Sequence, residues 1–552
     1  MKNGSALAFA LFLVAAPLGA QQAAFHVSDY NLALQLRDTG SVISGTASLT
    51  VVRRARSDTL VLDLLDLKVD RVMHFTKDPI PTELSFVQDS AHVRVFVGRL
   101  RTDTFNVVVY YGGAVRDGLI VGKDSAGRWM AFGDNWPNRA RHWIPSIDHP
   151  SEKATVSFSV LAPANRTVVA NGVPYSEASD SMLKAGPSPG VTYKMTRWRE
   201  KHPIPVYLFT IAAAPLARFD LPDAACGFAR DGGCVKQMVY TAPEQRAAMP
   251  ANFKYSPDIL DFFSHLVAPF PYEKLAHLQS STRFGGMENA SAIFYADGGF
   301  RRNGTGAGTI AHETAHQWFG DAVTEREWSN LWLSEGFATY FEQLWTRHAF
   351  GDSAFRAELS RTRTQIVRDP VVASRPVIDS EQTDLMKLLD ANSYQKGGWT
   401  LHMLRTLVGD SAFFRGIRAY YNAHVDGNAL TNDLMHSIEQ TSGMKLGWFF
   451  DQWLRRPGFA SITTSWRYDA AAKRVILDVE QGDKYAPYRL TLATSIVDAA
   501  GIAHMVRTEV AAERLSHITL PLPLDAAPKS LSFDPDVELL AEFHFKAAVP
   551  RN

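Results

Sequence analysis

Two histidines and a glutamate lie within five residues of one another, in the order His312, Glu313 and His316. Residues four apart share one face of an α-helix, so a helix over residues 310–320 would direct both histidines into one cleft. Imidazole nitrogens at this spacing are typical zinc ligands. Two solvated histidines on a surface helix would give the same pattern, so the motif alone is a modest signal.

A second glutamate, Glu335, follows His316 after eighteen intervening residues and lies in the mainly apolar stretch 330–338. If residues 321–327 connect two antiparallel helices, Glu335 returns to the histidines. Three protein ligands leave the fourth zinc position open, which is the arrangement of a catalytic rather than a structural zinc. We therefore expect one zinc ion per chain, bound by His312, His316 and Glu335.

The remaining acidic side chain of the motif, Glu313, is too close along the helix to bind the ion together with both histidines. A zinc ion lowers the pKa of its bound water toward about 7 and polarises a carbonyl group. Glu313 is placed to take the proton of this water and to pass it to a leaving amine. The chemistry expected of these residues is the hydrolysis of an amide.

Two further stretches could shape a substrate site. The first consists of Gly285, Gly286, Met287, Glu288 and Asn289. Its paired glycines would let the backbone approach a substrate closely, and its glutamate would be an anion beside the metal. The second, residues 393–398, carries Tyr394 at the start of a predicted helix, where the hydroxyl could reach into a cleft. Taken singly, the first stretch is also compatible with a turn bearing a solvated glutamate, and Tyr394 with a packed aromatic.

In chain order, the Gly-Gly-Met-Glu-Asn stretch, the histidine pair, Glu335 and the Tyr-x-Lys-Gly stretch at 394–397 resemble the gluzincin zinc aminopeptidases, the family of aminopeptidase N and the leukotriene hydrolase. The resemblance spans about residues 30–457. It implies that Glu288 holds the free α-ammonium of a peptide and that Tyr394 stabilises the tetrahedral intermediate. It also implies a saddle-like β domain, a thermolysin-like catalytic domain and downstream modules.

These implied roles favour an aminopeptidase that acts on peptides with a free N-terminus. A carboxylate paired with an α-ammonium fixes the first peptide bond over the metal and leaves blocked chain ends without a partner. One alternative is a thermolysin-like endopeptidase, and a second is an inactive peptidase scaffold that only binds. A third, epoxide hydrolysis, is compatible with the same metal but needs a lipid-shaped cavity.

The chain departs from the family pattern at two positions. The family usually places a second amine-anchoring Gln or Glu five residues before the arginine of an Arg-x-x-x-Pro stretch. Here that arginine is Arg141 and the matching position is Trp136, so Asp134 is the candidate for a second anchor. Ser334 stands where the family commonly has Asn; we expect this change to lie away from the metal and to be tolerated.

The composition indicates a soluble protein with several cores. The chain has 552 residues, of which 46% are hydrophobic and 21% are charged, and its formal net charge is zero. This length suggests three or four cores. Because no polybasic tract is present, we expect neither nucleic acid nor anionic lipid as a partner.

The periodicity of apolar residues predicts an α+β multidomain protein. Alternation recurs through residues 21–205 and predicts an N-terminal all-β domain. Residues 207–211 are predicted as one more strand, and helical periods then dominate a zinc catalytic domain, mainly helical, at 206–455. Alternation returns in residues 456–552, which we expect to form a C-terminal β-sandwich.

The N-terminus predicts export to the periplasm or the medium. Residues 1–20 have a basic start, an apolar run and small residues at the end, as a cleaved signal peptide has. Membrane association is expected only if this segment remains as an anchor. In an exported protein, Cys226 and Cys234 are expected to form a disulfide across the turn at 231–233. A second metal site at these cysteines is the weaker alternative, because no histidine pair completes it.

Overall fold

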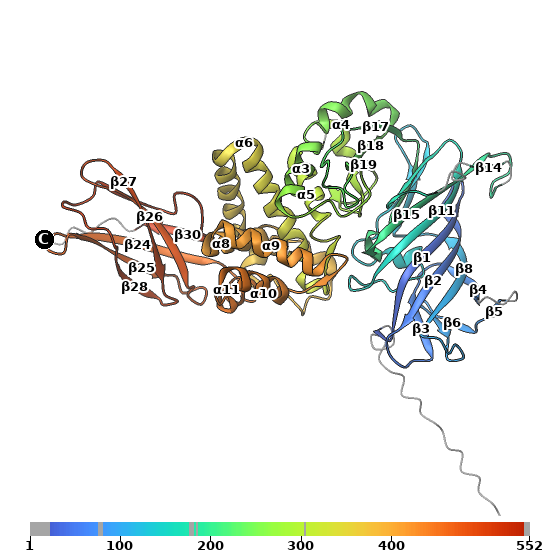
Figure 1. The fold of residues 1–552 in the computed structure, drawn as a ribbon, viewed down its shortest axis with the longest axis horizontal. Coiled ribbons are helices and arrows are strands. Elements are labelled where there is room, and N and C mark those ends of the chain that lie inside the picture. Colours follow the sequence, from blue (N-terminus) through green and yellow to red (C-terminus); the bar gives the residue numbers. More distant parts are fainter. Residues whose placement is uncertain (1–22, 76–80, 176–180, 184–185, 303–304, 546–552) are drawn as a thin grey trace, which may run out of the picture.

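The computed structural model describes residues 23–75, 81–175, 181–183, 186–302 and 305–545. They form three parts in a row: a β part at the N-terminal end, a mainly helical central part and a C-terminal pair of sheets (Figure 1). The predicted α+β multidomain fold is confirmed. The predicted signal peptide lies outside the described residues. Within the described residues, every helix is too short or too polar to cross a membrane.

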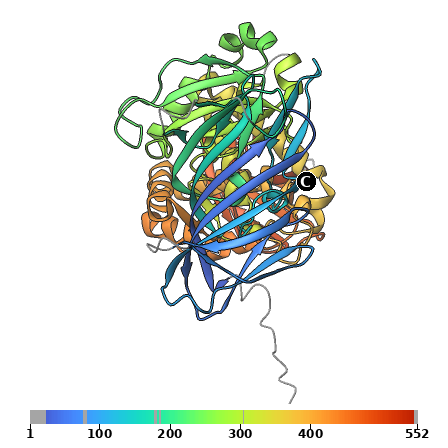
Figure 2. The ribbon, with the colours of Figure 1, turned by 90° about the vertical axis from the view of Figure 1, so that its right-hand side faces the viewer.

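The N-terminal part is built on a nine-stranded sheet, whose broad face is seen in Figure 2. Its strands are, in spatial order, β13 (Val173–Pro174), β15 (Tyr193–Pro205), β11 (Lys153–Pro163), β1 (Phe25–Leu36), β2 (Val42–Arg53), β8 (Thr104–Ala114), β4 (Lys68–His74) and β5 (Thr82–Glu83), with β14 (Ser181–Leu183) beside β15. In β1 every second side chain from Tyr30 to Leu36 is buried, as the alternation predicts.

Two smaller sheets complete the N-terminal part. One contains β12 (Thr167–Ala170), β16 (Ile211–Ala214), β10 (Trp129–Gly133) and β9 (Leu119–Lys123), and the other contains β3 (Thr59–Asp63), β7 (His92–Phe96) and β6 (Phe86–Gln88). The predicted strand at 207–211 is wrong for most of its length, because Val206–Leu208 form a 3-10 helix before β16 begins. The side chain of Asn171 replaces the strand ladder there: it donates to the Leu208 carbonyl at 2.9 Å and accepts from the Thr210 N–H at 2.7 Å.

The central part combines a five-stranded sheet with helices. The sheet order is β17 (Ala217–Asp220), β18 (Lys236–Thr241), β19 (Lys274–Ser280), β21 (Ala292–Ala296) and β20 (Gly286–Met287), and a small ladder pairs β22 (Val323–Glu325) with β23 (Gly427–Ala429). The helices are α2 (Met249–Asn252), α3 (Ser256–Leu266), α4 (Asp297–Arg302), α5 (Ala307–His316), α6 (Trp332–Arg368), α7 (Pro370–Ser374), α8 (Gly397–Val408), α9 (Asp410–His424), α10 (Thr431–Ser442) and α11 (Gly447–Leu454). β20 is an edge strand, so one side of its backbone is available to pair with a further chain.

The C-terminal part consists of two sheets, as the returning alternation predicts. One contains β28 (Leu515–Thr519), β25 (Arg474–Gln481), β24 (Ala460–Asp469) and β30 (Ala541–Phe545), and the other contains β27 (Ala503–Val510), β26 (Leu490–Val497) and β29 (Ser530–Phe533). In the central part, Cys226 and Cys234 form a disulfide.

A buried histidine in the central sheet makes the stability of the protein sensitive to acid. His277 on β19 contacts Ser256 Oγ at 2.8 Å and Tyr295 Oη at 2.9 Å, and burial lowers its pKa from the ordinary 6.5 to about 3. Unfolding lets the imidazole take up a proton below pH 6.5. Its contribution to the free energy of unfolding is therefore complete above pH 6.5 and falls by about 1.4 kcal/mol for each pH unit below that.

We expect the thermal midpoint of a His277→Gln variant to decline less steeply between pH 7 and pH 4.5 than that of the wild type. Differential scanning fluorimetry at half-unit pH steps measures both slopes. A variant of an exposed histidine, His517→Gln, should follow the wild type. Parallel profiles for wild type and His277→Gln would contradict the assignment of this acid sensitivity to His277.

Candidate active site

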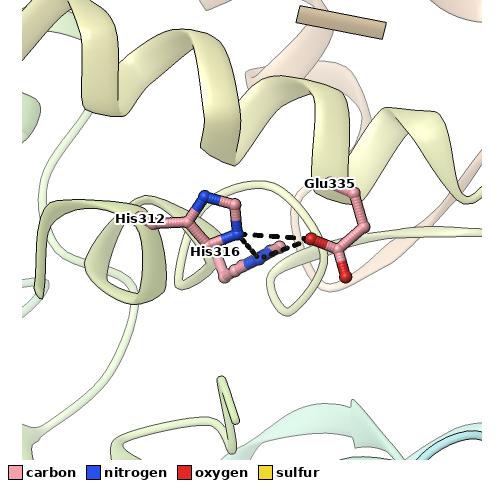
Figure 3. Close-up of side chains that lie close together, drawn as sticks. All are labelled: His312, His316 and Glu335. Atoms are coloured by element: carbon pink, nitrogen blue, oxygen red, sulfur yellow. Dashed lines mark hydrogen bonds and ion pairs between the residues drawn. The ribbon is translucent and has the colours of Figure 1, made fainter. Parts of the chain in front are cut away.

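Helices α5 and α6 bring the three predicted metal ligands together (Figure 3). His312 and His316 occupy the last two turns of α5, and Glu335 lies in the first turn of α6. The two Nε2 atoms are 3.2 Å apart, and each lies 3.3 Å from Glu335 Oε2. The helix ends at His316, earlier than the predicted residue 320, because the chain then turns at Gly320, whose φ is 121°.

The spacing of these three atoms fits a zinc ion. Bonds of about 2.0–2.1 Å in a tetrahedral site place neighbouring ligand atoms about 3.3–3.4 Å apart. The donor set of two imidazole nitrogens and one carboxylate oxygen is also one that zinc takes in catalytic sites. Burial disfavours charge on Glu335, but the two histidines outweigh it and lower the pKa of its carboxyl, so the oxygen is available as an ionised ligand.

In each histidine, the hydrogen-bond partner of Nδ1 determines whether Nε2 is free to bind a metal. His316 Nδ1 lies 3.2 Å from the Phe319 carbonyl oxygen, so this nitrogen carries the hydrogen and leaves Nε2 with a free lone pair. His312 Nδ1 faces Glu342 Oε2 at 3.5 Å, which favours the same tautomer. Neither partner was anticipated from the sequence.

Ser334, which differs from the residue common in the family, contacts one of the predicted metal ligands. Its hydroxyl lies 3.0 Å from His316 Nδ1, the ring nitrogen that does not face the predicted metal position. Ser334 directly precedes Glu335 at the start of α6, so the same helical turn supplies one ligand and supports another. A serine hydroxyl can accept the imidazole hydrogen as a carboxamide oxygen would, so the exchange keeps a hydrogen-bond acceptor at this position.

Glu313 lies in the same buried cavity but is not part of the ligand group. Burial raises the pKa of its carboxyl to about 7, although the neighbouring histidines lower it. Strand β20 passes against this side chain: a Cβ placed on Gly286 would be 2.1 Å from Glu313 Oε1. Gly286 is therefore required for the close approach of β20, whereas Gly285 has open space around its Cα.

Tyr394 reaches the metal ligands from a π-helical turn, Asn392–Lys396, that precedes α8. Its hydroxyl donates to Glu335 Oε1 at 2.7 Å, and its ring lies parallel to that of His312 at 6.0 Å. The helices bearing Glu335 and Tyr394 meet at Gly336 and Gly397, where an added Cβ on Gly336 would be 2.9 Å from the Cα of Gly397. Gly336, directly after Glu335, and Gly397, three positions after Tyr394, thus allow the two helical segments to approach each other closely.

Glu288 follows β20 and presents a buried carboxylate to the cavity. The side chain of Gln317, the residue after His316, fixes this stretch by donating to the Glu288 carbonyl oxygen at 2.9 Å and accepting from the Ser291 N–H at 2.7 Å. Among the described residues, no basic side chain forms an ion pair with the Glu288 carboxylate, and burial raises the pKa of this carboxyl. The cavity therefore holds an acidic side chain that lacks an ion-pair partner.

The cavity has a volume of about 340 Å³. It is lined by Trp136, Phe284, Gly285, Gly286, Met287, Glu288, Thr309, His312, Glu313, His316, Glu335, Glu342, Leu389 and Tyr394. Two of the residues expected at the site, Asn289 and Asp134, are missing from this wall, and Asn289 is wholly buried.

Asp134, the sequence candidate for a second amine anchor, does not line the cavity. It is wholly buried, and Oδ1 lies 3.0 Å from the guanidinium of Arg139. The aromatic ring of Trp136 occupies the wall instead and packs against Phe284 and Trp328 with centroids 5.9 and 5.6 Å apart. The expectation for Asp134 is therefore corrected, because its charge is already paired.

Two family models match this chain. Residues 26–208 match the Peptidase M1 N-terminal domain, and residues 252–453 match the Peptidase family M1 domain. Together the two matches cover more than half of the chain and include every lining residue of the cavity. This chain belongs to peptidase family M1. The resemblance seen in the sequence is confirmed, since both family models match and the relatives below are named aminopeptidases.

Among curated proteins, this M1 chain is 28% identical over 390 residues to aminopeptidase N of Streptomyces lividans, covering 66% of this chain and 43% of that protein. It is 27% identical over 385 residues to glutamyl aminopeptidase of Mus musculus, covering 67% of this chain and 39% of that protein. The chain thus spans less than half the length of these relatives.

Among solved structures, a mutant M1 zinc metallopeptidase from Deinococcus radiodurans matches with a TM-score of 0.67 and 25% identity, covering 79% of this chain and 95% of that one. Aminopeptidase A of Legionella pneumophila, solved with aspartic acid, matches with a TM-score of 0.80 and 16% identity, covering 95% of this chain and 60% of that one. The second likeness supports the fold alone.

Proposed function

We propose that this M1 chain is a zinc-dependent aminopeptidase that removes the first residue from peptides with a free N-terminus. The observation that carries the proposal is the Glu288 carboxylate, buried in the cavity without a cationic partner among the described residues. Burying an unpaired carboxylate is costly, and the α-ammonium of a peptide would supply the missing charge. An endopeptidase has no use for such an anion at the same place.

The roles of the remaining residues follow from their positions. A zinc ion bound by His312, His316 and Glu335 would polarise the scissile carbonyl and lower the pKa of the attacking water. Glu313 lines the cavity beside these ligands, so it takes the proton of that water on a carboxylate oxygen and delivers it to the leaving nitrogen. The Tyr394 hydroxyl donates a hydrogen bond to the oxygen on which negative charge develops.

The cavity wall favours an apolar first residue. Trp136, Phe284, Met287 and Leu389 present apolar surface beside Glu288. Edge strand β20 lies next to this wall and can pair with the backbone of an extended peptide. We therefore expect leucyl and phenylalanyl anilides to be cleaved faster than glutamyl anilide.

A Glu288→Ala variant tests the proposal. The wild type should release chromophore from leucyl anilide and none from N-acetyl-leucyl anilide. Loss of a hydrogen bond to a charged group costs about 1.5–3 kcal/mol, so we expect kcat/KM of the variant for the free-amine substrate to fall about 10- to 150-fold. Steady-state kinetics on both substrates measure this.

Equal cleavage of free and acetylated anilides by the wild type would favour the endopeptidase alternative. Unchanged kcat/KM for Glu288→Ala would contradict the anchoring role. Absence of stoichiometric zinc, together with indifference to chelator, would favour an inactive binding scaffold. An Asp223→Ala variant, which removes an exposed carboxylate far from the cavity, serves as the control.

We further propose that the protein is exported to the periplasm or the medium. The composition of residues 1–20 supports this, as does the disulfide between Cys226 and Cys234, since such bonds persist in oxidising compartments. Detection of mature protein that begins near residue 21 in the periplasmic or culture fraction would test it.

A further inference from the structure

A second group of ligand-type side chains lies outside the catalytic cavity. Glu200, His202 and Glu273 each offer one nitrogen or oxygen atom, and these atoms lie within 4.8 Å of one another. Glu200 and His202 belong to β15 of the nine-stranded sheet, and Glu273 directly precedes β19 of the central sheet. The group therefore joins the N-terminal part of the molecule to the central part.

The two carboxylates of this group are not neutralised by the protein. Glu200 is wholly buried. Its Oε1 accepts a hydrogen bond from the backbone N–H of His202 at 3.1 Å. Its Oε2 is buried with no hydrogen-bond partner among the described residues. Glu273 Oε2 is likewise buried without a partner in this part of the chain. Two carboxylates side by side, each with one buried and unpartnered oxygen, favour a proton or a cation between them.

The nearest basic side chains are committed elsewhere. Lys274 Nζ donates to the carbonyl oxygens of Ser291 and Ala170 at 2.7 and 3.3 Å. Arg230 forms two hydrogen bonds with the Asp426 carboxylate, at 3.0 and 2.6 Å. Lys274 is close enough to act electrostatically on both carboxylates, but its hydrogens go to carbonyl oxygens, and no ion pair joins Lys274 or Arg230 to Glu200 or Glu273 in the described structure.

We propose that Glu200, His202 and Glu273 bind a second divalent metal ion of the zinc class, separate from the catalytic metal. One imidazole nitrogen with two carboxylate oxygens is a donor set that suits zinc and its first-row neighbours. Calcium is a poorer match, because it takes six to eight oxygen ligands. A dication balances the two carboxylates, and the Tyr272 ring packs against His202 with centroids 6.3 Å apart, which holds the imidazole in place.

The bound ion would act as a bridge between the two sheets, because its ligands come from β15 and from the residue before β19. Metal binding that occurs only in the folded state stabilises that state by mass action. The expected consequence is a metal-dependent rise in thermal stability that does not depend on the catalytic ligands. The rival explanation is a single proton shared by Glu200 and Glu273, for which His202 is irrelevant.

Metal analysis of a His312→Ala, His316→Ala double variant separates this site from the proposed catalytic one. The full-length protein is loaded with excess zinc, desalted and measured by inductively coupled plasma mass spectrometry. We expect one zinc per chain in the double variant, and none when either Glu200→Gln or His202→Ala is added. In the wild-type background the same single substitutions should lower the content from two to one.

A half-buried histidine outside the group supplies the control: His142→Ala should leave the zinc content unchanged. Zinc should also raise the thermal midpoint of the double variant, and Glu200→Gln should abolish the rise. No zinc in the folded double variant, or one zinc that persists after both Glu200→Gln and His202→Ala, would overturn the proposal. The shared-proton explanation predicts the first of these results. Because the double variant lacks the catalytic ligands, failure of the proposed enzymatic function would leave this test intact.

Discussion

A Glu313→Gln variant should hydrolyse leucyl anilide about 10²- to 10⁴-fold more slowly than the wild type, with its zinc content unchanged. Glu313 lies between the two histidines on α5, yet its carboxylate is not in the ligand group. The amide of glutamine has nearly the same shape but cannot accept the proton of the attacking water. The loss should therefore appear in kcat, with KM close to that of the wild type.

Stopped assays at substrate saturation measure kcat, and metal analysis of the same preparation measures the zinc content. Glu327→Gln, an exposed glutamate in the connection between α5 and α6, is the matched control and should retain wild-type kcat. A fall in kcat of less than tenfold for Glu313→Gln would assign proton transfer to another group. Parallel loss of zinc would instead show that the carboxylate supports the metal site.

A Tyr394→Phe variant should lose about 2.7–4 kcal/mol of transition-state stabilisation, which corresponds to about a 10²- to 10³-fold lower kcat. Phenylalanine keeps the ring parallel to His312 but removes the hydroxyl that now donates to Glu335. The ground-state complex with the substrate is held by other residues, so KM should change little. Binding of a transition-state analogue should weaken by the same factor as kcat falls.

Tyr340→Phe is the matched control, because the Tyr340 hydroxyl is buried on α6 at 3.2 Å from His402, outside the cavity. Its kcat should equal that of the wild type. Zinc content is again measured for both variants, since the Tyr394 hydroxyl also contacts a metal ligand. Unchanged kcat for Tyr394→Phe with full zinc content would contradict oxyanion stabilisation by this residue.

Much of the fold could be predicted from local patterns. The helical periods predicted for residues 206–455 appear in the structure as helices, among them α8, α9 and α10. Strand alternation identified β1 and β2 because one face of each strand is buried. The strand predicted at 207–211 was wrong, since a continuous buried run carries no period and the Asn171 side chain took the place of a neighbouring strand.

The amino-acid sequence by itself determined the placement of the two histidines proposed as metal ligands. Four residues along a helix bring His312 and His316 to one face, and this geometry is local. The tertiary structure decided what surrounds them: Ser334 and Glu342 at the second nitrogens, Gln317 beneath the Glu288 stretch, and Trp136 rather than Asp134 in the wall. These contacts depend on how separate helices and strands pack, which no local period encodes. The contact between Gly336 and Gly397, sixty-one residues apart, is the clearest case, since only the packed helices reveal how little room an added side chain would have at either position.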